Sequence, residues 1–437
     1  KSSAASDVYK RQDNFAPGHR WGFFPSVALA WDITEEPFFK NLELKNVNLL
    51  KLRGSYGQTG TESGVNRFGY LSTYSLVENA ICIGGNLYSG FNEGALVSPE
   101  LLSWYTRDSY NYGLDYAFFQ HRLKGSVDYF FYITKGGLMS PADRYITPLG
   151  TALPQIKSDS EHRREGFEVS ARWSDKVGND FNYEVGTNMT YYNNLYVKNV
   201  SESLSALMNP YQRNTHQTDY YGLLLVDNGL YQSVDQVLGS PRRPESTETK
   251  LGDIVYQDIN GDGKVNSEDK VRYGMPTSPH FTYGVDFLLS YKGFSLSGLF
   301  YGTGKRHMMF GVNTMKAEAQ YVKNEYQLDY WTAENTDATF PRVSLAAGVN
   351  GENNRIESTF YLRNASFFRL KNLTLAYDFK YKLLKNVKWL TACRVNLTGS
   401  NLFTISGVSD YFDPETTSTN GGYPVSRIYS FGLTVGF

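Results

Sequence analysis

The chain has 437 residues, with 43 Lys and Arg against 44 Asp and Glu, so its formal net charge is −1. Binding of nucleic acid needs a stripe of basic residues, and this balanced composition gives no support for one, so we exclude nucleic acid as a partner. No run approaches the roughly 18 consecutive apolar residues of a transmembrane helix. Aromatic residues stand out, with 34 Tyr and 27 Phe in a chain that is only 20% charged. Tyr has an apolar body and a polar tip, which suits it to a membrane–water boundary.

The N-terminal segment lacks the features of an exported precursor. Residues 1–12 contain no apolar core and no signal-peptide pattern. We expect the chain to start within a longer protein. Residues 1–20 are therefore interpreted as an upstream or non-native segment.

Apolar and polar residues alternate with a period of two along most of the chain, which predicts β-strands. The clearest cases are residues 181–191 and 281–291, where nearly every second residue is aromatic or aliphatic. We predict eleven strands: 23–33, 48–57, 109–118, 122–133, 163–174, 181–191, 281–291, 294–303, 366–378, 391–401 and 428–437.

The connections between these strands alternate in length. The long ones are 58–108, 134–162, 192–280, 304–365 and 402–427. Since every second connection is long, all long loops emerge on one side. Short periplasmic turns and long extracellular loops are typical of outer-membrane barrels. The predicted fold is therefore all-β, an antiparallel transmembrane β-barrel wall. Eleven strands leave two open edges, which lipid does not tolerate, so upstream strands are expected to complete the barrel.

The strand at 366–378 departs from regular alternation. Phe368 and Leu370 share one parity, whereas Leu373 and Leu375 share the other. A β-bulge near residues 371–372 would bring both pairs onto one apolar face.

The last ten residues carry the most specific local signal. Their apolar face ends on the terminal aromatic residue and consists of Tyr429, Phe431, Leu433, Val435 and Phe437. It resembles the C-terminal strand that the outer-membrane assembly machinery recognises. The alternative is an ordinary amphipathic strand at a chain end.

Residues 258–269 resemble a calcium-binding loop. Asp258, Asn260 and Asp262 place oxygen ligands at positions 1, 3 and 5, Lys264 offers its backbone carbonyl at position 7, and Asp269 closes the loop at position 12. Calcium needs about six to eight oxygens, and this spacing gathers them around one point. Asp at position 12 departs from the EF-hand pattern and resembles dockerin-type loops. The ion would stabilise the long loop; the alternative is an Asx- and Gly-rich turn that needs no ion.

Other chemistry-bearing residues give weaker indications. Polar residues at inward-facing strand positions are expected to line a lumen: Arg53, Lys124, Asp128, Glu168, Arg172 and Glu184. Aromatic loop residues offer stacking surfaces for sugar rings or, as we favour, packing between long loops: Tyr211, Tyr220, Tyr221, Tyr321, Tyr326, Tyr330 and Trp331. No Gly-x-Ser-x-Gly motif frames a serine, and no histidine pair has ligand spacing. We expect no catalytic or cofactor-binding residue and no enzyme activity.

Several segments resemble the SusC/RagA class of TonB-dependent outer-membrane transporters. They include residues 20–27 (RWGFFPSV), 50–60 (LKLRGSYGQTG), 252–263 (GDIVYQDINGDG) and 361–364 (YLRN). The matches follow the family order over nearly all of residues 20–437. The resemblance implies that residues 21–437 are the C-terminal half of a barrel of about 22 strands, with a plug domain encoded upstream.

The resemblance also implies partners and a location. They are a SusD-like surface lipoprotein, the TonB complex, the lipid of a Gram-negative, Bacteroidetes-like outer membrane, and an oligosaccharide or peptide as substrate. Two other functions stay open. One is a self-contained passive porin or adhesin barrel, which a plug-encoding sequence upstream would exclude. The other is a soluble calcium-dependent carbohydrate-binding β protein, which would stay in solution without detergent.

Overall fold

The computed structural model describes residues 2–11, 14–62, 65, 70–71, 73–93, 103–139, 156–200, 202, 204–214, 218–309, 328–343, 349–408, 412–415 and 425–437. Two compact units divide the chain. Unit 1 comprises residues 1–169, 192–207 and 214–218, and unit 2 comprises residues 170–191, 208–213 and 219–437. Twelve strands are hydrogen-bonded in the order β1-β2-β3-β6-β7-β10-β11-β16-β17-β20-β21-β22.

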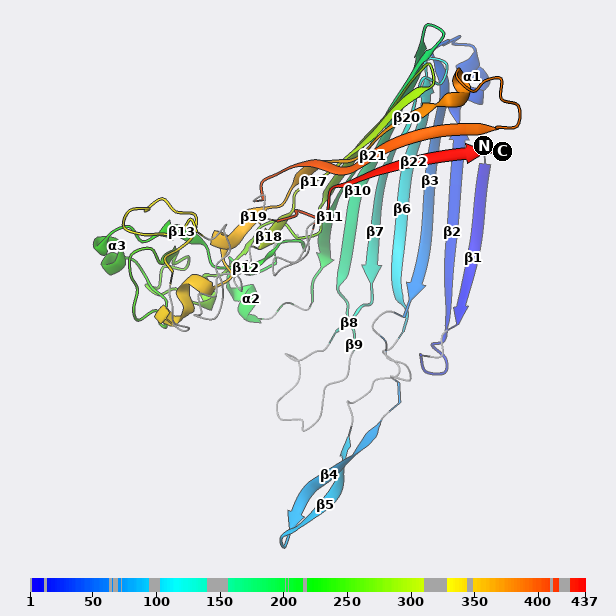
Figure 1. Ribbon diagram of the computed structural model, residues 1–437. Coiled ribbons are helices and arrows are strands. Elements are labelled where there is room, and N and C mark those ends of the chain that lie inside the picture. Colours follow the sequence, from blue (N-terminus) through cyan, green and yellow to red (C-terminus); the bar gives the residue numbers. More distant parts are fainter. Residues whose placement is uncertain are drawn as a thin grey trace. The chain divides into compact units, whose positions relative to one another are not determined.

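Unit 1 contains the N-terminal strands. Its elements are β1 (Ser2–Arg11), β2 (Trp21–Asp32), α1 (Pro37–Lys40), β3 (Val47–Thr61), β4 (Tyr74–Ile83), β5 (Asn86–Glu93), β6 (Tyr105–Phe118), β7 (Leu123–Lys135), β8 (Leu138–Met139) and β9 (Ile156–Lys157), with most of α2 (Leu204–Met208). The sheet strands lie side by side, with α1 at one end of them and the β4–β5 hairpin beyond the other (Figure 1). β10 (Glu161–Val177) and β11 (Phe181–Lys198) contribute residues to both units.

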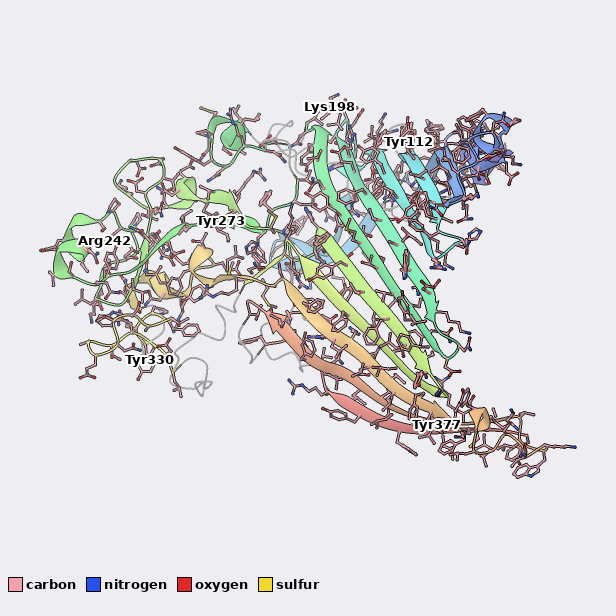
Figure 2. All side chains as sticks on the ribbon, turned by 90° about the horizontal axis from the view of Figure 1, so that it is seen from above. Tyr112, Lys198, Arg242, Tyr273, Tyr330 and Tyr377 are labelled. Atoms are coloured by element: carbon pink, nitrogen blue, oxygen red, sulfur yellow. The ribbon has the colours of Figure 1, made fainter. Side chains whose placement is uncertain are left out.

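Unit 2 contains the C-terminal strands and short loop elements. The strands are β16 (Phe281–Tyr291), β17 (Phe294–Gly304), β20 (Phe367–Asp378), β21 (Ala392–Ser406) and β22 (Ile428–Gly436). The loop elements are β12 (Gly222–Leu224), β13 (Asp227–Leu230), α3 (Val234–Gly239), β14 (Ile254–Tyr256), β15 (Val271–Tyr273), β18 (His307–Met309) and β19 (Leu362–Asn364). Figure 2 shows Tyr377 near one end of these strands, and Tyr273 and Tyr330 in the loops beyond the other end.

All eleven predicted strands are present, with boundaries that differ by a few residues. The sheet has one strand more, because β1 pairs with β2 over residues 2–11. Residues 2–11 lie in the segment that the sequence predicts to be upstream or non-native, and they show no clear alternation of apolar residues. An edge strand is held by backbone hydrogen bonds on one side, so it forms without that pattern. Among the described helices, none is long and apolar enough to cross a membrane.

The predicted bulge in β20 is confirmed. Leu299 pairs with Asn372 while Phe300 pairs with Leu370, so Lys371 is the extra residue. The same shift appears on the β21 side of the strand. Beyond it, Leu373 and Leu375 point to the same face as Phe368 and Leu370, because the bulge changes the parity once.

Adjacent residues of the strands face opposite environments. In unit 1, Leu52, Leu114 and Val127 pair in register, and the next row contains Arg53 and Asp128. In unit 2, one row contains Leu296, Leu375, Leu397 and Phe431, and the next contains Ser297, Thr374, Thr398 and Ser430. The apolar rows are exposed, with Leu397 at 54% and Phe431 at 71%. Such a sheet has an oily face without a core to cover it, as expected of a wall in contact with lipid.

The loops of unit 2 form a hydrophobic core of their own. Its buried members include Leu225, Ile254, Met308 and Tyr361. Asp253, which is fully buried, ties distant loop segments together: its carboxylate accepts hydrogen bonds from Asn350 and Asn354 at 2.8 Å and pairs with Arg342 at 2.5 Å. A buried carboxylate is tolerated only when it is hydrogen-bonded and paired in this way.

Candidate functional site

The polar face of unit 1 is organised by an arginine that reaches across two strands. The Nε of Arg53 donates to both oxygens of Asp115 on β6 at 3.0 Å, and Nη2 donates to Asp128 on β7 at 3.0 and 3.1 Å. Gly113 on β6 lies between Arg53 and Asp128 and pairs in register with both. A Cβ at Gly113 would lie 2.7 Å from Arg53 Cζ and 2.5 Å from Asp128 Oδ1, so glycine leaves room for the guanidinium.

The same arrangement recurs in unit 2. Arg172 on β10 pairs with Glu184 on β11, and its Nη2 donates to Asp286 on β16 at 3.0 Å. Gly186 lies between them, and a Cβ there would stand 2.7 Å from Arg172 Nη2. Each cluster sets one guanidinium against two carboxylates, so each carries a formal charge of −1. These polar, half-exposed clusters suit a wall that faces water.

Sequence reasoning found part of this site. It selected Arg53, Asp128, Arg172 and Glu184, and the structure brings them into the two clusters. It missed Asp115 and Asp286, whose partners are set by strand order and register rather than by local sequence. The two remaining predicted lumen residues, Lys124 and Glu168, are exposed and form no ion pair with a described residue.

A third polar cluster lies at the loop end of β20 in unit 2. Arg369 is only 2% exposed, and its Nη2 donates to both oxygens of Asp413 at 2.9 Å. Glu415 accepts from Arg369 and from the bulge residue Lys371, the latter at 3.0 Å. A cavity of about 490 Å³ adjoins the cluster. Arg306, whose backbone carbonyl accepts from the Ala365 N–H at 3.0 Å, is 4% exposed. Burial lowers the pKa of its guanidinium, and no described residue accepts from its Nε.

The predicted calcium loop forms a compact turn. Asp269 is fully buried, and its carboxylate accepts from the backbone N–H groups of Ile259, Asn260 and Asn266 at 2.8–3.2 Å. At the other end, Asp258 accepts from Gly261, Asp262 and Gly263 at 2.7–3.2 Å.

These contacts test how well the loop suits calcium. Asn260 and Asp262 each accept one backbone N–H within the loop, and both are exposed with Lys264. Among the described residues, no group of three or more His, Cys, Asp or Glu is placed to hold a metal ion. The backbone already satisfies the carboxylates, as the ion-free alternative requires. Calcium binding stays a prediction.

The C-terminal strand has the predicted two-faced character. All five residues of its apolar set are exposed, including Tyr429 at 72% and Phe437 at 80%. Their neighbours on the other face are Ser430, Gly432 and Thr434. Recognition by the assembly machinery stays a prediction.

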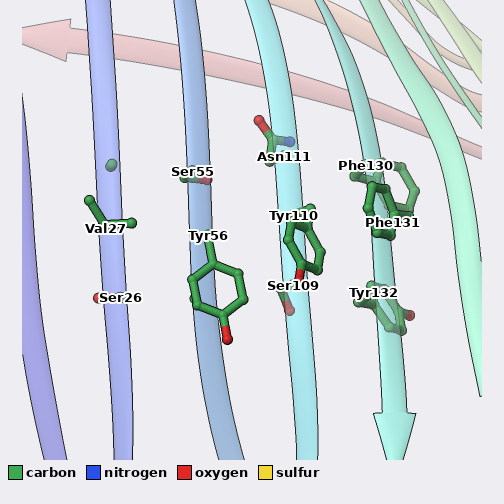
Figure 3. Close-up of a pocket in the computed structure, with 12 residues that line it drawn as sticks. Ser26, Val27, Ser55, Tyr56, Ser109, Tyr110, Asn111, Phe130, Phe131 and Tyr132 are labelled. Atoms are coloured by element: carbon green, nitrogen blue, oxygen red, sulfur yellow. The ribbon is translucent and has the colours of Figure 1, made fainter. Parts of the chain in front are cut away.

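A row of rings crosses the apolar face of unit 1. Tyr56, Tyr110 and Phe131 pair in register on β3, β6 and β7, with ring centroids 5.0 and 4.6 Å apart. Figure 3 shows them side by side next to Val27, at a depression of about 400 Å³. Aromatic girdles mark the membrane interfaces of barrels. Tyr110 lies eight residues from Phe118 at the other end of β6, or about 27 Å along the strand.

Packing accounts for several aromatic loop residues. Tyr221 and Trp331 contact the hydrophobic core of unit 2, and the Arg272 guanidinium lies 4.5 Å above the Tyr220 ring. Tyr330 forms a backbone bridge with Phe340, and Tyr211 is 46% exposed. The other two predicted residues, Tyr321 and Tyr326, lie outside the described residues.

Known proteins are similar to this chain in sequence and in fold. The chain is 27% identical over 460 residues to TonB-dependent receptor P3 of Formosa agariphila and 27% identical over 439 residues to TonB-dependent receptor SusC of Bacteroides thetaiotaomicron, in both cases over 97% of the chain. Structures of the RagAB peptide importer in open-open and closed-closed states superpose on all of it with TM-scores of 0.75 and 0.73 at 21% identity. The chain is thus similar in sequence to TonB-dependent receptors that include SusC, and it shares the fold of the RagAB transporter.

The chain spans 43% of the length of receptor P3, 41% of SusC and about 45% of the solved RagAB chain. No protein-family model matches it. TonB-dependent receptors are outer-membrane β-barrel proteins. The exposed apolar rows of the sheet suit contact with lipid, and in each unit the arginine cluster lies in the alternate rows.

Proposed function

We propose that the chain forms part of the wall of a nutrient importer in the outer membrane. A SusD-like lipoprotein would cover its extracellular face, and the TonB complex would supply energy through a plug domain. The observation that carries this proposal is similarity to TonB-dependent receptors along 97% of the chain, together with a sheet that is apolar on one face and polar on the other. No bond of the substrate is made or broken.

The cargo is an oligosaccharide or a peptide. The RagAB protein, which shares the fold, is a peptide importer. The polar face offers hydroxyl and amide groups, such as Thr374, Thr398 and Asn396, and the half-exposed ion-pair clusters. Such groups hydrogen-bond to hydrated cargo, and both candidate classes are rich in donors and acceptors.

The proposal is tested by uptake in cells that carry or lack the gene. With the intact gene, we expect labelled oligosaccharide or peptide to be accumulated, and accumulation to stop when TonB is disrupted or the paired lipoprotein is deleted. Uptake that persists without TonB would support the passive-pore alternative instead. A chain that remains in solution after detergent-free fractionation would support the soluble carbohydrate-binding alternative.

A further inference from the structure

The turn between β20 and β21 has an unusual charge pattern. Residues 379–391 (FKYKLLKNVKWLT) contain four lysines and no acidic residue. The connection between β2 and β3, residues 33–46, also exposes large apolar side chains, but it mixes three Glu with two Lys, and Lys40 pairs with Glu35 at 2.6 Å. The lysines of 379–391 have no such partners within their own turn.

This turn has a defined conformation. The Asp378 carboxylate accepts from the Lys380 N–H at 2.9 Å, and the Lys380 ammonium donates to the Val387 carbonyl at 2.9 Å. The Thr391 N–H donates to the Gly436 carbonyl at 2.8 Å, which fixes the turn to the last strand. The remaining side chains are therefore displayed by an ordered backbone.

The displayed side chains are basic and aromatic. Lys382, Lys385 and Lys388 are exposed, and none forms an ion pair or side-chain hydrogen bond with a described residue. Leu383 is 66% exposed and Trp389 is 67% exposed.

The turn also continues the lipid-contacting face. The Trp389 ring stacks on Phe437, which directly follows β22, with centroids 5.8 Å apart and an interplanar angle of 9°. At the other end of the turn, Phe379 meets Tyr377 edge-on at 5.0 Å, and Tyr377 contacts Phe294 across the strands at 4.5 Å. The apolar side chains of the turn are thus joined to the rows that contact the acyl chains.

We propose that residues 379–391 bind anionic phospholipid headgroups in the periplasmic leaflet of the outer membrane. Trp389 and Leu383 would enter the interface, where amphipathic rings are favoured, while the three free lysines contact headgroup phosphates. The charge is complementary to an anionic surface, and the site is continuous with the lipid-facing sheet. The inference rests on the membrane location of the chain and not on its cargo.

The test measures the phospholipid bound by the whole receptor. The protein is equilibrated with phosphatidylethanolamine vesicles containing phosphatidylglycerol, and lipid retained after purification is quantified by mass spectrometry. We expect the native protein to be enriched in phosphatidylglycerol. In the triple variant K382Q/K385Q/K388Q this enrichment should fall by about fivefold for each lysine lost at low salt. The matched control K198Q/K250Q/K270Q removes the same charge from the long connection 192–280 and should retain the enrichment.

Three further arms identify what occupies the site. K382R/K385R/K388R should restore phosphatidylglycerol binding, and W389A should weaken it while the charge is unchanged. Inorganic phosphate at millimolar concentration should not displace the lipid; displacement would show a free-anion site and overturn the proposal. The proposal would also be overturned if the correctly assembled Gln variant kept its full enrichment of phosphatidylglycerol. It would likewise be overturned if the Gln variant lost a bound second copy or another bound protein and kept its lipid. None of these readouts depends on uptake, so they are independent of the proposed transport.

Discussion

Arginine at two successive positions of β21 should have very different effects. Leu397 lies in register between Leu375 and Phe431 on the apolar face. Thr398 lies between Thr374 and Ser430 on the polar face, and its hydroxyl is 3.0 Å from that of Thr374. The variants L397R and T398R introduce the same side chain one residue apart, so they differ in the face they alter.

The magnitudes follow from the two environments. An arginine in contact with lipid near the bilayer centre costs about 2–4 kcal/mol, whereas a lumen-facing one costs little. T398R loses the hydroxyl–hydroxyl hydrogen bond, about 1 kcal/mol. The difference in the free energy of unfolding is therefore roughly 1–3 kcal/mol, or about 5- to 150-fold in the equilibrium constant.

The assay is urea unfolding of the receptor in phospholipid vesicles, with folded barrel measured by its altered mobility on unheated gels. L397R should unfold at clearly lower urea than T398R. Equal destabilisation of the two variants, or a larger loss in T398R, would refute the assignment of the two faces.

Four other outcomes follow from the described contacts. R53M leaves two carboxylates without their cation and should lower stability by about 1–2 kcal/mol, since the cluster is partly exposed; R53M/D128N should recover part of this in urea unfolding. Deleting Lys371 removes the extra residue of the bulge and its ion pair with Glu415. Cysteine labelling should still find the apolar residues beyond it on the same face; a switch of faces would contradict the observed register. Burial lowers the pKa of His307, whose Nδ1 accepts from a backbone N–H at 2.7 Å. The neutral imidazole therefore stabilises the folded loop. This stabilisation is complete above the unfolded pKa of about 6.5 and is lost as the pH falls through the lower folded pKa. Hydrogen exchange of that loop, corrected for intrinsic rates, should rise on acidification in the native protein but not in H307N. D269A should loosen the 258–269 loop even with chelator present. Calorimetry of the chelated native protein tests calcium binding, and no uptake at millimolar calcium would contradict the predicted calcium site.

The strands were predictable because the two-faced environment imposes a local pattern. Even the bulge at Lys371 was visible, since Leu370 and Leu373 break a parity that lipid contact requires to be kept. The extra strand β1 was not predicted, because an edge can form through backbone pairing alone.

Long-range polar partners were beyond the sequence. Arg53 was recognised as a lumen residue, but its contact with Asp115 depends on β3 pairing with β6 across a long insertion. The partners of Asp253 were equally hidden from the sequence, because the asparagines that donate hydrogen bonds to it lie about 100 positions away. Gly113 and Gly186 gave no signal, since the need for close approach arises only when the three strands are assembled.

The most direct measurement of the central claim is spin-label accessibility along β21 and β22 in lipid bilayers. After replacement of the two native cysteines, labels at Leu397 and Phe431 should be accessible to oxygen dissolved in the bilayer, and labels at Thr398 and Ser430 to a water-soluble nickel reagent. An alternating profile is the predicted result. Uniform access of the nickel reagent to all four positions would contradict a wall with lipid on one side and water on the other.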